Sequence, residues 1–248
     1  MYRDVPDGAD PAADDAAVVA DTLAAMDRNG VEVGLVTLSH PAAAGAARDH
    51  PDRFVLAGQV DVGVGGEGVV GAVRRIRADR AEHGIRAVST FPAGTRPELP
   101  IDAAAWYPVY ATCVELGLPV FVTAGVPGPR VPLGAQHVEG VDRVMYDFPE
   151  LVMVLRHGAE PWAALAVKLM LKWPGLHYST SAFAPKHYPR EIVDFANTRG
   201  AHKVLYAGYH PYALELDRIF AELDDVPFRD HVWAPFLRDN AARILGIG

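Results

Sequence analysis

Short apolar runs and amphipathic stretches alternate along almost the whole chain. The first amphipathic stretch, DAAVVADTLAAMDRNG, begins at Asp14 or Asp15, and its apolar residues recur at helical spacing until Asn29-Gly30. A second long helix is predicted over EGVVGAVRRIRADRAEHG and ends at Gly84. The apolar runs between such stretches predict seven strands, over residues 31–39, 54–62, 85–92, 118–125, 151–158, 176–183 and 204–211.

The order of these elements predicts an α/β fold. The strand runs lack clean alternation of apolar and polar residues, which is typical of parallel strands covered on both faces. No change of composition or linker divides the chain, so residues 1–248 are expected to form a single domain. The segment GVGGEG at 63–68 lacks the spacing of a phosphate-binding loop and is read as a plain turn. The pattern therefore favours a (β/α)8 TIM-barrel-like fold over an open dinucleotide-binding sheet.

A complete barrel needs eight strands, and the pattern predicts seven βα units. The opening segment, MYRDVPDGADP, is too rich in Pro, Gly and Asp for a core strand. Strand one is therefore predicted to be missing, and either the barrel is gapped, or an upstream piece or a neighbouring chain fills the place. Open sheet edges favour pairing with another chain, so a homo-oligomer is expected.

Composition and charge narrow the classes of partner. Half of the 248 residues are apolar, 22% are charged, and the net charge is −8 with scattered Lys and Arg. Nucleic acid and membranes are therefore not expected as partners. The acidic start lacks the plan of a secretory signal, which favours a cytoplasmic protein. The single cysteine, Cys113, lies in an apolar helical pattern and is expected to be a buried hydrophobe.

In a barrel, reactive groups lie where strands end and βα loops begin. Three residues at such ends are the catalytic candidates: His157, Tyr209 and His210. His157 ends an apolar strand, where its position suits an acid, a base or a metal ligand. The alternative is a histidine that caps a helix or is satisfied by the backbone.

Five further residues near strand ends are candidates for binding a small-molecule substrate: Thr123, Arg130, Ser181, Lys186 and His187. Arg130 follows PGP in a long loop, where it either clamps a carboxylate or is a solvated arginine. Lys186 and His187 lie in the proline-bounded loop APKHYP, which is either a lid or an exposed loop without a role.

The chain is not expected to bind a metal or another cofactor. A zinc site needs three or more His, Asp, Glu or Cys side chains that converge. Among the strand ends only His157 and His210 offer such groups, and the sequence has no HxH pair.

Several motifs resemble a known family. The segments LGLPVFVTAG, ELVMVLRHGAEPW, LHYSTSAFAPKHYP, KVLYAGYHP and FLRDNAARILGI are similar to the amidohydrolase-related branch of the amidohydrolase superfamily. That branch includes decarboxylases similar to aminocarboxymuconate semialdehyde decarboxylase. The resemblance runs in order from about residue 17 to the end of the chain and implies a barrel with hydrolase or decarboxylase chemistry.

The chain departs from the metal-binding pattern that this resemblance implies. Metal-containing members carry HxH at strand one, histidines at strands five and six, and aspartate at strand eight. Here the last three positions read Thr123, His157 and Tyr209, and the strand with HxH is absent. The resemblance also includes metal-free 2-pyrone-4,6-dicarboxylate lactonases, but these keep the strand-eight aspartate. The opening segment is similar to the loop that leads from strand one to the first helix, which suggests a shortened or misassigned start.

Two functions remain open from the sequence. The first, which is favoured, is a metal-independent hydrolase or carboxy-lyase that acts on a small carboxylated substrate, either cyclic or open-chain, at the barrel mouth. In it His157 is a general acid or base, Tyr209 donates to a developing oxyanion, and His210 is a secondary proton carrier. Arg130 and Lys186 anchor the carboxylate. The second is a non-catalytic barrel that lost the metal site and serves as a binding or partner subunit.

Overall fold

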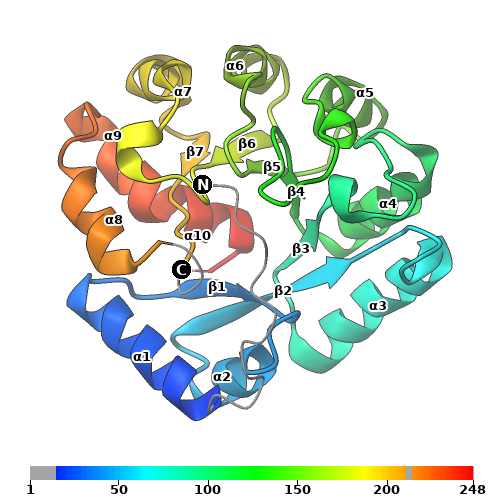
Figure 1. Ribbon diagram of the computed structural model, residues 1–248, viewed down its shortest axis with the longest axis horizontal. Coiled ribbons are helices and arrows are strands. Elements are labelled where there is room, and N and C mark those ends of the chain that lie inside the picture. The colour runs from blue at the N-terminus through cyan, green and yellow to red at the C-terminus, as the bar shows by residue number, and fades with distance from the viewer. Residues whose placement is uncertain (1–14, 211–213, 248) are drawn as a thin grey trace.

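The computed structural model describes residues 15–210 and 214–247, and these form one curled sheet of seven parallel strands surrounded by helices (Figure 1). The strands pair in chain order, from β1 to β7. Their bounds are β1 Gly34–Thr37, β2 Phe54–Val60, β3 Ala87–Thr90, β4 Val120–Thr123, β5 Met153–Arg156, β6 Leu176–Ser179 and β7 Val204–Leu205. The predicted TIM-barrel-like α/β fold with seven strands is confirmed.

Helices follow the strands and cover the outer face of the sheet (Figure 1). The longer ones are α1 Asp15–Arg28, α3 Gly68–His83, α4 Tyr107–Leu116, α5 Gly140–Asp147, α6 Ala163–Lys172 and α8 Leu216–Leu223. Shorter ones are α2 Ala43–Asp49, α7 Arg190–Phe195, α9 Asp230–Ala234 and α10 Asn240–Leu245. The predicted end of α3 is confirmed, because Gly84 follows it with φ of 65°, a left-handed conformation that glycine adopts without strain.

All seven strands are shorter than the apolar runs that predicted them. The run over residues 85–92, for example, forms a strand only over Ala87–Thr90. Ile85 is nevertheless fully buried, because flanking residues of a barrel strand pack under helices without joining the ladder. The apolar pattern therefore shows which residues are buried, and the hydrogen-bonded strand covers only part of each buried run. In the last run, Pro211 lies outside the described residues.

The inner face of the sheet is apolar at the amino-terminal ends of the strands, where the C-terminal helix closes it. Leu245 of α10 packs against Ala57 of β2 and Ala87 of β3. The neighbouring apolar side chains of this cluster are Leu35, Val55, Phe121 and Ile247. The interior of the barrel is therefore a filled core at the amino-terminal ends of the strands, and an active site is expected at the carboxyl ends.

The outer edge of β7 is covered by the same C-terminal segment. Asn240 is 3% exposed, and its side-chain amide donates to the carbonyl oxygens of Ala201 and Val204 at 2.7 and 2.9 Å. The Tyr206 amide donates to the Phe236 carbonyl at 2.7 Å. A helix thus satisfies backbone groups that a further strand would otherwise pair.

Helices α1 and α8 meet outside the opening between β1 and β7 (Figure 1). Arg28 at the end of α1 forms an ion pair with Asp217 of α8 at 2.9 Å, and Asn29 donates to the same carboxylate at 2.5 Å. Beneath these polar contacts, Met26 of α1 and Leu216 of α8 belong to one apolar cluster. The two ends of the curled sheet are therefore joined by helix packing, and the predicted homo-oligomer stays a prediction.

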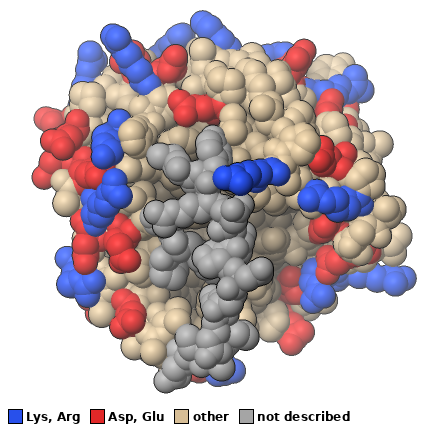
Figure 2. All heavy atoms as spheres, in the orientation of Figure 1, with Lys and Arg blue, Asp and Glu red and all other residues tan. Residues whose placement is uncertain are grey.

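The surface carries both signs of charge. In the view of Figure 2, Lys and Arg are interspersed with Asp and Glu around the rim of the molecule. Within residues 15–210 and 214–247, no helix has both the length and the apolar character needed to cross a membrane.

Replacing the side chain that caps β7 tests the role of the C-terminal segment. Asn240→Ala removes the side-chain donor from the buried Val204 carbonyl and the partly buried Ala201 carbonyl, which we expect to lower the free energy of unfolding by about 1 to 3 kcal/mol. Urea denaturation measures the loss. Asn197→Ala is the control, because Asn197 makes its backbone hydrogen bonds at an exposed site. Equal losses in the two variants would contradict the proposed cap.

A buried histidine makes stability depend on pH. His177 of β6 is 4% exposed on the inner face, and burial, with the nearby charge of Lys203, lowers its pKa from 6.5 to about 3. In the unfolded chain His177 therefore binds a proton below about pH 6.5, whereas in the folded chain it stays neutral down to about pH 3. Between these values His177 lowers the free energy of unfolding as pH falls, by at most about 1.4 kcal/mol per pH unit.

Urea denaturation between pH 4 and 6.5 measures this effect. We expect His177→Gln to flatten the dependence by about one proton relative to the unsubstituted protein. His231→Gln serves as the control because His231 is exposed. An unchanged slope in His177→Gln would show that His177 is protonated in the folded state.

Candidate active site

The inner face of the sheet becomes polar towards the carboxyl ends of the strands. Ser89 of β3 pairs in register with Gln59 of β2, and Thr123 of β4 pairs with Arg156 of β5. Side chains in register share a face of the sheet, and Ser89 is also in register with the inward-facing Phe121. A polar layer therefore lies above the apolar lower core, at the barrel end where sites of this fold occur.

Arg156 is the main charged group of this layer. Its guanidinium donates to the Ser89 hydroxyl, across the intervening strand β4. Burial lowers the pKa of Arg156 from its ordinary value, and the nearby Tyr209 phenol acts in the opposite direction. Within the described residues, no Asp or Glu forms an ion pair with Arg156. The mouth of the barrel therefore holds a partly buried cation whose hydrogen-bond partner, among the described residues, is a neutral hydroxyl.

His157 follows Arg156 directly but leaves the strand geometry. Its φ is 66°, a left-handed conformation that costs energy for a residue with a Cβ. The His157 amide donates to the Ser181 hydroxyl at 3.0 Å, and the same hydroxyl lies 3.3 Å from the imidazole Nδ1. Ala182, beside Ser181, also has a positive φ, of 69°. Strained backbone is thus concentrated where the β5 and β6 loops meet, a common feature of functional sites.

The His157 ring is neutral at ordinary pH. Burial is the main cause, the charge of Arg156 adds to it, and a hydrogen bond with Ser181 opposes it, so that the pKa falls from 6.5 to about 3. A neutral imidazole has one nitrogen that donates and one that accepts a hydrogen bond. The neutral His157 ring can therefore donate one hydrogen bond and accept another, and it can take up a proton; it becomes a proton donor only once protonated.

Tyr209 joins His157 at the site, and His210 points elsewhere. The Tyr209 ring meets the His157 ring edge to face, with centroids 5.5 Å apart. The Nδ1 atom of His210 lies 3.8 Å from a carboxylate oxygen of Glu215, the residue before α8. Of these two adjacent catalytic candidates, Tyr209 is in ring contact with His157, whereas His210 lies beside Glu215.

Neighbouring loops hold the loop after β5 in place. Tyr178 of β6 donates to the Gly158 carbonyl at 3.0 Å, and Val126 donates from its amide to the Glu160 carbonyl at 2.9 Å. Gly125 has φ of 91°, and a Cβ there would lie 2.7 Å from the Glu160 oxygen. Glycine is therefore required where the β4 and β5 loops pass each other.

The other predicted substrate-binding residues fall into two groups. Thr123 and Ser181 are buried at the site, and Thr123 donates to the Thr90 carbonyl at 3.2 Å. The remaining three, Arg130, Lys186 and His187, are exposed on loops. The turn Pro185–His187 packs against α8, where Lys186 and His187 contribute to lowering the pKa of Glu222, after Arg218.

The residues at the site do not fit the metal centre that the resemblance implies. Of the three aligned positions, only His157 offers a ligand that first-row metals favour, beside a threonine and a tyrosine. Across residues 15–210 and 214–247, no group of three or more His, Cys, Asp or Glu side chains could hold a metal ion. We therefore derive no chemical step through a metal.

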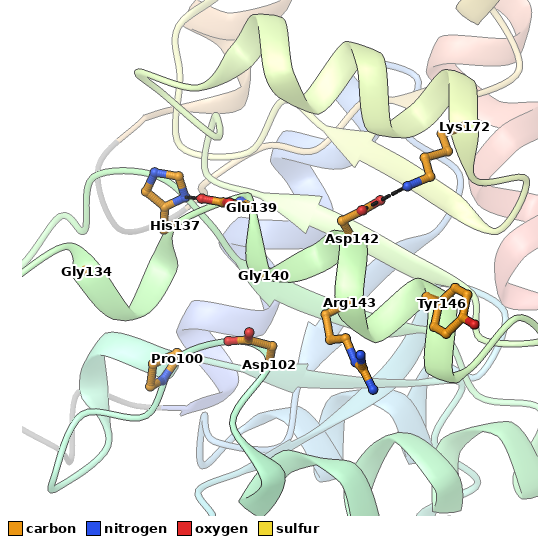
Figure 3. Close-up of a pocket in the computed structure, with 10 residues that line it drawn as sticks. All are labelled: Pro100, Asp102, Gly134, His137, Glu139, Gly140, Asp142, Arg143, Tyr146 and Lys172. Carbon is orange, nitrogen blue, oxygen red and sulfur yellow. Dashed lines mark hydrogen bonds and ion pairs between the residues drawn. The ribbon is translucent and has the colours of Figure 1, made fainter.

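A groove of about 640 Å³ lies away from the candidate site, on the outer side of α5 (Figure 3). Its charges are largely paired: Lys172 with Asp142 at 2.7 Å, and Arg143 with Asp147, also at 2.7 Å. Figure 3 shows that His137 lies at the other end of the groove, beside Glu139. None of the predicted site residues lines this groove.

Sequence reasoning named Arg156 as a strand end but gave it no role. The segment LVMVLRHG did indicate where Arg156 points. Arg156 lies two residues after Val154 on the same strand, so both side chains face the inside of the sheet. Ser89 carries the same signal in β3, two residues after the inward-facing Ala87. The partnership of Arg156 with Ser89 could not be predicted, since it depends on the curvature of the sheet.

Solved structures of low sequence identity share this fold. An uncharacterised TIM-barrel protein from Bordetella bronchiseptica is 23% identical, with a TM-score of 0.80 over 91% of this chain and 81% of its own. A 2,6-dihydroxybenzoate decarboxylase from Rhizobium is 14% identical, with a TM-score of 0.69 over 91% and 87%. A 5-carboxyvanillate decarboxylase from Novosphingobium aromaticivorans, solved with manganese and a nitrobenzoic acid, is 16% identical, with a TM-score of 0.69 over 92% and 80%.

No curated protein matches the chain. The family described as "Amidohydrolase" matches residues 3–247, which is nearly the whole sequence. This match confirms the family that the motifs predicted, and with it the prediction of an enzyme of the hydrolase or decarboxylase type. The chain belongs to the amidohydrolase family.

Proposed function

We propose that this enzyme is a metal-independent hydrolase or carboxy-lyase that acts on a small carboxylated organic substrate at the barrel mouth. Arg156 binds the substrate carboxylate, and His157 transfers the proton. The three solved structures give the fold, and the chemistry is argued from the residues of this chain.

The observation that carries the proposal is the partly buried guanidinium of Arg156, whose pKa is lowered by desolvation. Removing a charge from water is costly unless a partner of opposite charge compensates it. In the described residues that partner is a serine hydroxyl, which carries no charge. A planar guanidinium matches a carboxylate with two parallel hydrogen bonds, so a substrate carboxylate would supply the missing charge.

A bound carboxylate would also change His157. Arg156 is one cause of the low pKa of His157, after burial. An anion at Arg156 cancels that repulsion and adds an attraction of its own, so the pKa of His157 rises towards the range in which general acids and bases work. Substrate binding would thus prepare the imidazole for proton transfer.

Tyr209 and Ser181 complete the proposed site. The Tyr209 ring is in edge-to-face contact with the His157 ring, and its phenol would donate to a developing oxyanion. Ser181 holds His157 through its backbone amide and Nδ1, which makes it a positioning residue. In hydrolysis His157 would accept a proton from water, and in decarboxylation it would deliver one to the carbon that loses CO2.

The carboxylate anchor can be tested by binding. We expect 2,6-dihydroxybenzoate, used as a carboxylated probe, to bind the unsubstituted protein and to raise its Tm. Arg156→Gln removes the charge but keeps a hydrogen-bonding amide, and should weaken binding about 10- to 100-fold, as for a lost charge-assisted hydrogen bond. Isothermal calorimetry and thermal unfolding in the same buffer measure both effects.

Two further variants serve as controls for the binding test. Arg190→Gln changes an exposed arginine on α7 and should leave binding unchanged. Arg130→Gln tests the rim position that the sequence favoured. Equal binding by Arg156→Gln and the unsubstituted protein would refute the anchor. Binding without turnover in a screen of carboxylated lactones and hydroxybenzoates would favour a binding protein over an enzyme.

The pKa of His157 gives a test that does not need the natural substrate. Nuclear magnetic resonance of the imidazole Cε1–H should show a pKa near 3 in the free protein, because the ring is buried beside Arg156. We expect the pKa to rise by at least one unit when the probe is bound, and to rise without ligand in Arg156→Gln. If the pKa of His157 changed neither with the bound probe nor in Arg156→Gln, His157 would not be coupled to an anion site at Arg156.

A further inference from the structure

A second cationic cavity lies at the opposite end of the barrel. This basal pocket has a volume of about 240 Å³, and three arginines line it: Arg80, Arg86 and Arg243. Arg86 directly precedes β3, and Leu118, also in the lining, lies two residues before β4. The basal pocket is therefore at the amino-terminal ends of the strands, away from His157.

The arginines of the basal pocket have no acidic partner within the described residues. Arg80 donates to the Ile85 carbonyl at 2.7 Å, and Arg243 donates to the His202 carbonyl at 2.8 Å. These contacts use neutral acceptors and occupy one nitrogen of each guanidinium. Arg86 is exposed. The remaining donors are available to a ligand, since each guanidinium has five N–H groups.

Helix ends near the pocket offset only part of this charge. Helices α3, α4 and α10 end close to it, at the left-handed glycines Gly84, Gly117 and Gly246. Each helix C-terminus carries about half a negative charge at most, so three ends balance about half of the three guanidinium charges. The positive charge of Arg243 also acts on its neighbours, since it contributes to lowering the pKa of His202 and of Lys203.

We propose that the basal pocket binds a phosphate group. A carboxylate has two oxygens and satisfies a single arginine in the two-bond arrangement, whereas a tetrahedral phosphate presents oxygens to three arginines at once. The cavity is smaller than the 300 to 1,000 Å³ or so of pockets for drug-sized ligands, which suits one phosphate. The phosphate is either inorganic phosphate or the terminal group of a phosphomonoester that extends into solvent.

Phosphate at this position would tie the C-terminal segment to the sheet. Arg243, Ile244 and Leu245 of α10 line the pocket, and Leu245 also packs on Ala57 and Ala87 inside the barrel. An anion shared by Arg86, before β3, and Arg243, on α10, therefore connects the two sides of this contact. Ligand binding to the folded state should raise the Tm in proportion to occupancy.

Calorimetry and thermal unfolding with inorganic phosphate, in 150 mM chloride, test the proposal. We expect the unsubstituted protein to bind one phosphate and to gain Tm. Arg86→Gln should weaken binding at least tenfold without loss of folding, because Arg86 is exposed, and Arg86→Gln with Arg243→Gln should abolish it. Arg74→Gln is the matched control, since it removes the same charge from an exposed position on α3 outside the pocket.

Two additional arms identify the ligand and the site. Phenyl phosphate that binds more tightly than inorganic phosphate would indicate a phosphomonoester, and the reverse order would indicate the free ion. Arg156→Gln should leave phosphate binding unchanged, which separates this pocket from the proposed active site. Absence of binding in the unsubstituted protein, equal binding in Arg86→Gln and Arg74→Gln, or loss of binding in Arg156→Gln would each overturn the proposal.

Discussion

The cap on the outer edge of β7 is the constraint on which the rest of the structure depends. A parallel sheet of seven strands presents a free edge at each end, and unpaired backbone groups at a buried edge are costly. Asn240 donates to the Val204 carbonyl and the Phe236 carbonyl accepts from the Tyr206 amide, so the C-terminal segment satisfies two such groups on the β7 side. The same helical segment places Leu245 inside the lower barrel. One C-terminal segment thus closes the edge, fills the lower core and leaves the opposite end of the barrel for the site.

At that opposite end the sheet places a positive charge that has no acidic partner among residues 15–210 and 214–247. Arg156 faces inward because of strand parity, and its protein partner is the Ser89 hydroxyl. The next residue, His157, has a positive φ that directs it to Ser181 and Tyr209. A partly buried cation and a neutral imidazole at the end of β5 are thus brought together with a phenol from the loop after β7. Under the proposed function, this set would bind an anion and move a proton without a metal, for which residues 15–210 and 214–247 offer no group of three or more His, Cys, Asp or Glu ligands.

Much of the fold could be predicted from the sequence, because apolar runs mark burial and a parallel barrel is buried on both faces. The run around residues 151–158 predicted β5, and His157 was correctly placed at its end. Strand lengths were overestimated, since residues such as Ile85 are buried outside the ladder. The ring contact between Tyr209 and His157 needed the closure of the sheet, which no local pattern encodes. The partner of Arg156 lies 67 positions away in the chain for the same reason.

The central claim is that a carboxylate binds at Arg156 in a site without a metal. A crystal structure of the protein grown with 2,6-dihydroxybenzoate and excess manganese, with anomalous data collected at the manganese edge, tests it most directly. We expect carboxylate oxygens within hydrogen-bond distance of the Arg156 guanidinium and no anomalous peak beside His157. A manganese ion coordinated by His157, or a probe bound away from Arg156, would contradict it.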